Sequence, residues 1–117
     1  MAYAIGGKLT HQDSYGEKII KSVLDFYDIK YRQEEIRNIH KYNEDFYYIR
    51  FDFYLPKHRT VIEYNGEQHY HYSPTYHKNK EAFQRQKNRD KAVKDYCKDK
   101  KIQLITVRYS GIKRGFG

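Results

Sequence analysis

The chain has 117 residues and is strongly basic, with a formal net charge of +8 and a pI of about 9.4. This length supports a single domain with one modest core. No apolar run approaches the roughly 18 residues that span a bilayer, and residues 1–10 lack the apolar core of a signal peptide, so we expect no membrane segment and a cytoplasmic protein. The basic charge favours a polyanionic partner, either nucleic acid or an anionic membrane surface.

The mean hydropathy of −1.07 is low for a folded chain, but 14 Tyr and 6 Phe provide aromatic surface to bury. We therefore expect a folded domain with a polar surface. The single cysteine, Cys97, excludes an internal disulfide and a zinc site built from thiolates. Its position beside Tyr96 on an apparent helix face predicts a buried apolar residue rather than a nucleophile.

The N-terminal part combines a loose arm with a capped helix. Residues 1–13 have no strong pattern and are expected to form the arm. Apolar residues recur at helical spacing from Ser14 to about Asp28, which predicts a helix. Glu17 follows Ser14 by three residues, the spacing of a capping box, so capping is the simplest interpretation of this acid.

Two strands joined by a Pro-containing turn form the centre of the predicted fold. A short strand over residues 29–35 and a polar loop over residues 37–45 lead into them. The two strands span residues 50–55 and 60–65, and the turn between them contains Pro56. Antiparallel pairing across this turn makes a hairpin.

Two carboxylates interrupt the apolar segments of this hairpin. Asp52 lies between Phe51 and Phe53, and Glu63 ends an apolar run. Burying a charge costs several kcal/mol unless the charge is paired or bound to a metal. In the hairpin register residue 52 lies near the level of residue 63, where two carboxylates can share one divalent cation.

The rest of the chain adds a loop, a helix and a strand. Residues 68–79 are rich in His and Tyr and are expected to form a loop. A second helix is predicted over residues 80–98 and a strand over residues 102–109, followed by a basic tail at 110–117. The predicted elements follow one another as helix, strand, strand, strand, helix, strand. This order predicts a single domain over residues 1–117 that mixes helices and strands, in the broad α/β class and more narrowly α+β.

Positive charge is concentrated in the second helix. Residues 78–101 contain ten Lys or Arg against four Asp or Glu, a net +6 of the total +8. A solvated helix face explains much of this, but a basic helix beside a carboxylate pair also places a phosphate-attracting surface next to a cation site. The residues expected to contact nucleic acid are Lys80, Arg85, Lys87, Lys91, Lys94 and Arg108.

Five residues, Glu17, Asp52, Glu63, His69 and Asp90, occur in an order that resembles the PD-(D/E)xK nuclease superfamily. More narrowly, the chain is similar to the very-short-patch-repair endonucleases and the related phage homing endonucleases, whose active-site pattern is Glu-Asp-x-His-Asp. The similarity extends over about residues 14–109. It implies a restriction-endonuclease-like core, with a mixed sheet of about four strands flanked by two helices, and a metal-dependent DNA endonuclease of phage or mobile-element origin.

The resemblance also implies roles for these residues. Asp52 and Glu63 would hold Mg²⁺, for which Mn²⁺ can substitute, and this ion would polarise the scissile phosphate. His69 would accept the proton of the attacking water. Glu17 would orient water or a second ion, and Asp90 would either fix the tautomer of His69 or pair with a lysine of its helix.

The sequence departs from the superfamily at Asn65, where a lysine is usual and where Asn cannot act as a base. Either His69 takes this role, as the resemblance implies, or Lys91 or Lys94 reaches in from the second helix. A third possibility is a non-catalytic DNA-binding module, although such carboxylates without a metal would cost stability.

Two further alternatives concern the metal and the assembly. A zinc-dependent nuclease would use His69, His71 and His77, but no zinc-finger pattern surrounds them. A double-strand cut needs two active sites, and hence a homodimer or two successive nicks.

Overall fold

The structure is a computed structural model that describes residues 3–5, 8–10, 14–65 and 78–108. It has an α+β architecture with a four-stranded mixed sheet and two helices, which confirms the predicted class and, from α1 onward, the predicted order of helices and strands. The elements are β1 (Tyr3–Ile5), β2 (Lys8–Thr10), α1 (Tyr15–Phe26), β3 (Arg32–Asn38), β4 (Tyr48–Leu55), the 3-10 helix η1 (Pro56–His58), β5 (Thr60–Asn65), α2 (Lys80–Asp99) and β6 (Gln103–Arg108).

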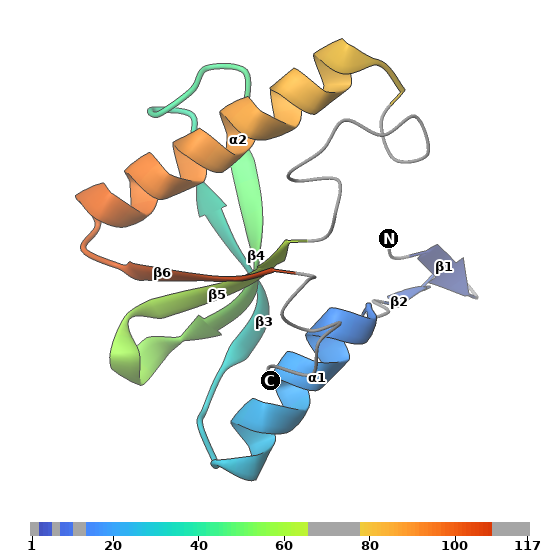
Figure 1. Ribbon diagram of the computed structural model, residues 1–117, viewed down its shortest axis with the longest axis vertical. Coiled ribbons are helices and arrows are strands. Elements are labelled where there is room, and N and C mark those ends of the chain that lie inside the picture. Colours follow the sequence, from blue (N-terminus) through green and yellow to red (C-terminus); the bar gives the residue numbers. More distant parts are fainter. Residues whose placement is uncertain (1–2, 6–7, 11–13, 66–77, 109–117) are drawn as a thin grey trace.

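The main sheet has the strand order β3-β4-β5-β6. Strands β3, β4 and β5 are antiparallel neighbours, whereas β5 and β6 are parallel. Parallel neighbours require a crossover, and α2 provides it. Figure 1 shows α2 on one side of the sheet and α1 on the other. The carboxylate hairpin of β4 and β5 therefore lies between two helical layers.

Both helices end in the same way, and this shifts the strands that follow them. Asp28 has a φ of 55°, in the left-handed region, and the Ile29 amide donates a 2.9 Å hydrogen bond to the Leu24 carbonyl. After α2, Lys101 has a φ of 58° and the Ile102 amide bonds the Cys97 carbonyl at 2.8 Å. This pairing closes a helix C-terminus.

Two predicted strand boundaries are wrong, because the residues that end each helix delay the start of the strand that follows. The strand expected at 29–35 is instead β3, Arg32–Asn38, because Ile29 is still used to close α1. The strand expected from residue 102 begins at Gln103 for the same reason.

The N-terminal arm was expected to lack structure, and this prediction is wrong for two short segments. Tyr3 pairs with Thr10 and Ile5 with Lys8 in an antiparallel β1–β2 pair. The sequence contains a signal for this pairing, because a Gly-Gly dipeptide between two short runs favours a hairpin.

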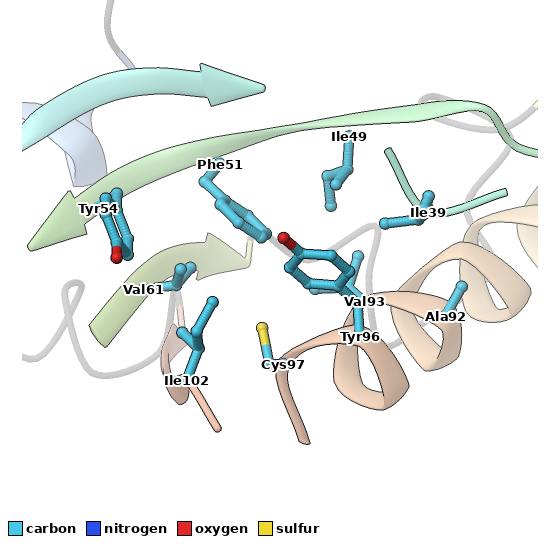
Figure 2. Close-up of a cluster of buried hydrophobic side chains, with 10 residues drawn as sticks. All are labelled: Ile39, Ile49, Phe51, Tyr54, Val61, Ala92, Val93, Tyr96, Cys97 and Ile102. Carbon is cyan, nitrogen blue, oxygen red and sulfur yellow. The ribbon is translucent and has the colours of Figure 1, made fainter. Parts of the chain in front are cut away.

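The larger core, which we call the α2-side core, lies between the sheet and α2 (Figure 2). Cys97 is 2% exposed within it, as predicted, and burial is the main cause that raises the pKa of its thiol to about 11. A thiol with this pKa is not a nucleophile at neutral pH. The core consists of Ile39, Ile49, Phe51, Tyr54, Val61, Ala92, Val93, Tyr96, Cys97 and Ile102.

A smaller cluster, the α1-side core, lies on the other face of the sheet. Its buried members are Ile20, Leu24, Phe53, Leu55 and Ile62. Within the described residues, neither helix is long and apolar enough to cross a membrane.

Candidate functional site

The β4–β5 hairpin places Asp52 beside Glu63, as the sequence predicts. Phe53 pairs with Ile62 in the antiparallel ladder, so Asp52 and Glu63 are the next residues outward. The Asp52 amide donates a 2.8 Å hydrogen bond to Oε2 of Glu63. The Tyr64 amide in turn donates a 2.8 Å hydrogen bond to Oδ2 of Asp52. Each carboxylate is therefore held by an amide of the opposite strand.

Strand β4 changes face at Asp52. Phe51 packs in the α2-side core and Phe53 in the α1-side core, although residues two apart on a regular strand point to the same face. Glu34, level with Asp52 on β3, has a φ of 57°, in the left-handed region. At this irregular position the Asp52 amide donates to the side chain of Glu63.

Glu17 caps its own helix and also reaches Asp52. The Ser14 amide donates a 2.9 Å hydrogen bond to Oε1 of Glu17, and the Glu17 amide donates one of 3.3 Å to Oγ of Ser14, which confirms the predicted capping box. The Glu17 carboxyl also lies close enough to Asp52 to contribute to the raised pKa of that side chain. This approach requires Gly16, because a Cβ there would lie 2.4 Å from Cε1 of Tyr64.

Electrostatics at Asp52 favour a bound cation. The pKa of Asp52 is raised to about 8, chiefly by burial and then by the carboxylates of Glu63 and Glu17, while the hydrogen bond from Tyr64 opposes the rise. Such a carboxyl is largely protonated at neutral pH unless a positive charge lies beside it. Because carboxylate oxygens are ligands that Mg²⁺ prefers, the donors at Asp52 and Glu63 fit a small divalent cation.

The three carboxyl groups do not form one three-ligand site. Among the described residues, no group of three or more His, Cys, Asp or Glu side chains is placed to hold a metal ion. Glu17 comes from α1 and Glu63 lines a pocket with α2, so the two approach Asp52 from opposite layers. Mg²⁺ is commonly held by one or two carboxylates together with water and substrate phosphate oxygens. A site at Asp52 and Glu63 matches that arrangement.

A small cavity, the acid pocket, lies beside Glu63 on the α2 side. It has a volume of about 30 Å³, enough for one or two water molecules or an ion. Its lining residues are Glu63, Asn65, Asp90, Val93, Lys94, Leu104 and Thr106.

A larger cavity, the basic groove, runs between α2 and β6. Its volume is about 380 Å³, within the range of ligand-binding clefts. It shares Asn65, Asp90, Lys94 and Thr106 with the acid pocket. Its lining residues are Asn65, Lys87, Asp90, Lys91, Lys94, Thr106 and Arg108.

The six basic residues predicted to contact nucleic acid fall into two groups, those that line the groove and those that do not. Lys87, Lys91, Lys94 and Arg108 line it. Lys80 and Arg85 are not among the described residues that line the groove. Arg85 instead donates a 3.2 Å hydrogen bond to the Asp45 carbonyl and lies over the Phe46 ring, 4.6 Å from its centroid. Arg85 therefore supports the loop before β4.

Two residues were expected to take part in proton transfer, Asp90 and His69, and the structure describes the first but not the second. Asp90 lines both cavities, and its Oδ1 lies 3.7 Å from Nη1 of Arg89, the neighbouring residue. His69, His71 and His77 fall in residues 66–77, outside the described residues, so the roles of all three stay predictions.

Two residues that shape the site, Gly16 and Thr106, were not predicted from the sequence. Gly16 carries no local signal, since its contact with Tyr64 joins elements far apart in the chain. Thr106 lies on a strand whose alternation was recognised, but its place beside Glu63 depends on the parallel pairing of β5 with β6.

Comparisons with known proteins identify relatives but no family. Over 62 residues, the chain is 45% identical to uncharacterized protein 307L of invertebrate iridescent virus 6. It is 36% identical over 62 residues to uncharacterized protein 033L of invertebrate iridescent virus 3. Each match covers 53% of this chain but 32% of the relative, so the chain spans about a third of the length of these relatives. No family model and no solved structure matches the chain.

Proposed function

We propose that this chain is a metal-dependent DNA endonuclease on a restriction-endonuclease-like core. The observation that carries the proposal is the pair of Asp52 and Glu63, each held by a backbone amide of the opposite strand, beside a groove with four cationic side chains. A partly buried carboxylate pair is costly by itself, whereas a cation and a phosphate would complete it. The groove supplies the positive charge that a phosphodiester backbone requires.

The residues of the chain divide the work of hydrolysis. Asp52 and Glu63 would hold Mg²⁺, or Mn²⁺ in its place, and the bound ion would supply Lewis-acid stabilisation of the phosphate. The Tyr64 amide keeps Asp52 in position, and Glu17 orients it from α1. In the proposal, His69 accepts the proton of the attacking water.

Origin and assembly belong to the same proposal. The relatives with shared sequence come from viruses, and we propose a phage or mobile-element nuclease that works in the cytoplasm of the host cell. Cutting both DNA strands would use a homodimer or two successive nicks.

A second candidate function is a non-catalytic DNA-binding module on the same fold. The observation in its favour is that the basic groove binds phosphates without any need for the carboxylate pair. The two functions differ in what they require of Asp52 and Glu63, since only the nuclease needs both carboxylates.

The test is the incubation of supercoiled plasmid at low salt with Mg²⁺, Mn²⁺ or EDTA. Wild type should nick or linearise the plasmid only with a divalent ion, and Asp52→Asn and Glu63→Gln should each lower the rate by about a hundredfold or more. Glu44→Gln, which removes one charge from an exposed acid in the loop before β4, is the matched control and should cut like wild type.

The binding module predicts a different pattern. If wild type and both site variants retard the plasmid equally in EDTA and none cuts it with either metal, the nuclease proposal is overturned. Cleavage that survives in Asp52→Asn would also exclude the carboxylate pair as the catalytic site.

A further inference from the structure

Lys94 connects the acid pocket with the basic groove. Both cavities are lined by Asn65, Asp90, Lys94 and Thr106, so the groove opens onto the pocket that contains Glu63. Of the cations that line the groove in the described part of the chain, Lys94 alone also lines the acid pocket. A phosphate bound by Lys94 would therefore be next to the carboxylate site.

The helix geometry places the lysines of the groove in a row. Lys87, Lys91 and Lys94 are spaced by four and three residues, so they share one face of α2. With a rise of about 1.5 Å per residue, their Cα atoms advance by about 6 Å and about 4.5 Å along the axis. Arg108 faces them from the end of β6. Such a row suits consecutive phosphates of one strand.

The lysines of the row also differ in their present partners. Nζ of Lys91 lies 2.9 Å from Oδ2 of Asp95, a residue of the next turn. Within residues 3–5, 8–10, 14–65 and 78–108, no group forms a hydrogen bond or ion pair with Nζ of Lys94, whose backbone is part of α2. Lys94 is thus available for a ligand at the mouth of the acid pocket.

We infer that the basic groove is the path of a single, unpaired DNA strand and that Lys94 contacts the phosphate to be cleaved. Lys87, Lys91 and Arg108 hold the flanking phosphates. The volume of about 380 Å³ gives room for about one nucleotide unit between α2 and β6, which suits a strand that lies in the groove without its complement. This inference rests on the proposed nuclease function for the role of Lys94 in cleavage, but not for the path of the strand.

Binding is measured first, in EDTA, so that no cleavage is needed. The probe is a fluorescein-labelled oligothymidylate of about 16 nucleotides, followed by fluorescence anisotropy over a range of salt concentrations. Lys94→Ala and Lys91→Ala should each weaken binding by about threefold to tenfold, and each should reduce the slope of log K against log salt by about 0.7. Lys30→Ala is the control, because Lys30 is exposed and lies in the segment that joins α1 to β3, and α1 is on the opposite side of the sheet from α2 (Figure 1).

Two binding results would overturn the strand path. One is an equal loss of affinity in Lys30→Ala and Lys94→Ala, which would mean that only net charge matters. The other is that a hairpin duplex of the same sequence length competes as well as the single strand, which would assign the groove to duplex DNA.

Cleavage of the same oligonucleotide with Mg²⁺ then separates the roles of the two lysines. At saturating oligonucleotide, Lys94→Ala should lower kcat by about tenfold or more, whereas Lys91→Ala should raise KM and leave kcat near the wild-type value. An unchanged kcat in Lys94→Ala would overturn its role at the cleaved phosphate.

The failure of the nuclease proposal would look different. Wild type would then bind the oligonucleotide through Lys94 and Lys91 in EDTA but would cut no DNA in any metal. In that outcome the strand path stands as the path of a binding module. If wild type cuts DNA while neither lysine affects binding or kcat, the nuclease stands and the strand path is wrong.

Discussion

The two faces of the sheet are built for different tasks. The α2 face has a closed core of ten buried residues and, beside it, the polar basic groove. The α1 face has five buried residues and an apolar cavity of about 390 Å³, lined in part by Val23 and Tyr27, which are 43% and 67% exposed. Among the described residues, the same sheet is thus tightly covered on one side and more loosely covered on the other.

Helix length explains much of this difference. The 20 residues of α2 extend for about 30 Å, whereas the 12 residues of α1 extend for about 18 Å. The longer helix covers the α2 side and still presents a charged face to the groove. Because the α2 side buries more apolar residues, we expect it to contribute more of the stability, whereas the pKa of Asp52 depends on carboxylates from both sides, Glu63 and Glu17.

The sharpest test of this comparison uses two phenylalanines of one strand. Phe51 and Phe53 are both 0% exposed, and they pack in the α2-side and α1-side cores respectively. Each change to Ala should lower the free energy of unfolding by about 3–5 kcal/mol. Phe51→Ala should be the more damaging of the two, because the closed core collapses less around the cavity. Urea unfolding measures both, and a larger loss for Phe53→Ala would contradict the comparison.

The next largest effect concerns Asp52 and pH. Its pKa is raised to about 8 in the folded state, so its favourable contribution to stability is complete below the unfolded value of about 3.9 and is lost as pH rises through about 8. Asp52→Asn should therefore be more stable than wild type at neutral pH without metal, and the difference should widen by about 1 kcal/mol per pH unit between about pH 5 and pH 7.

Unfolding curves at several pH values, in EDTA, measure this difference. Glu44→Gln, at an exposed acid, should show no such widening. A constant difference between Asp52→Asn and wild type across the range would mean that Asp52 stays ionised. Added Mg²⁺ should reduce the advantage of Asp52→Asn, since a bound cation stabilises the wild-type carboxylate.

Gly16 tests how closely the shorter helix must approach the sheet. Gly to Ala inside a helix normally stabilises by about 1 kcal/mol, but a Cβ here would lie 2.4 Å from the Tyr64 ring. Gly16→Ala should therefore destabilise by about 1–2 kcal/mol and should separate Glu17 from Asp52. Ser22→Ala, on the exposed face of α1, is the control and should be neutral or slightly stabilising. A stabilised Gly16→Ala would show that the ring moves away easily.

The smallest expected effects distinguish the caps of the two helices. Oγ of Ser14 accepts the Glu17 amide, and Oδ1 of Asn79 accepts the Ala82 amide at 2.9 Å. Ser14→Ala and Asn79→Ala should each cost about 1 kcal/mol by thermal unfolding. Only Ser14→Ala should also lower cleavage, because loss of Oγ loosens the first turn of α1, which carries Glu17, even though the amide of residue 14 can still donate to the Glu17 carboxylate. Equal loss of cleavage in both variants would remove the special role of the α1 cap.

Much of the fold follows from patterns within a few residues. The Ser14 and Glu17 spacing predicts the capping box. Helical periodicity predicts an inner face of α2 at Phe83, Ala92, Val93, Tyr96 and Cys97, and all of these except the partly exposed Phe83 are buried. The position of Asp52 beside Glu63 also follows from the sequence, because a short turn between two strands determines their register. These are local determinants, and apart from Phe83 each agrees with the structure.

The tertiary structure alone decided which of these residues meet. Glu17 reaches Asp52 because Gly16 lets α1 lie close to Tyr64, a contact between residues 48 positions apart. Lys94 lines the acid pocket, while Arg85 on the same helix supports a loop, because the rotation of α2 against β6 determines which of its faces is turned to the groove. Periodicity predicts that a helix has a buried face, but the packing of distant elements determines which charged residues lie beside the site.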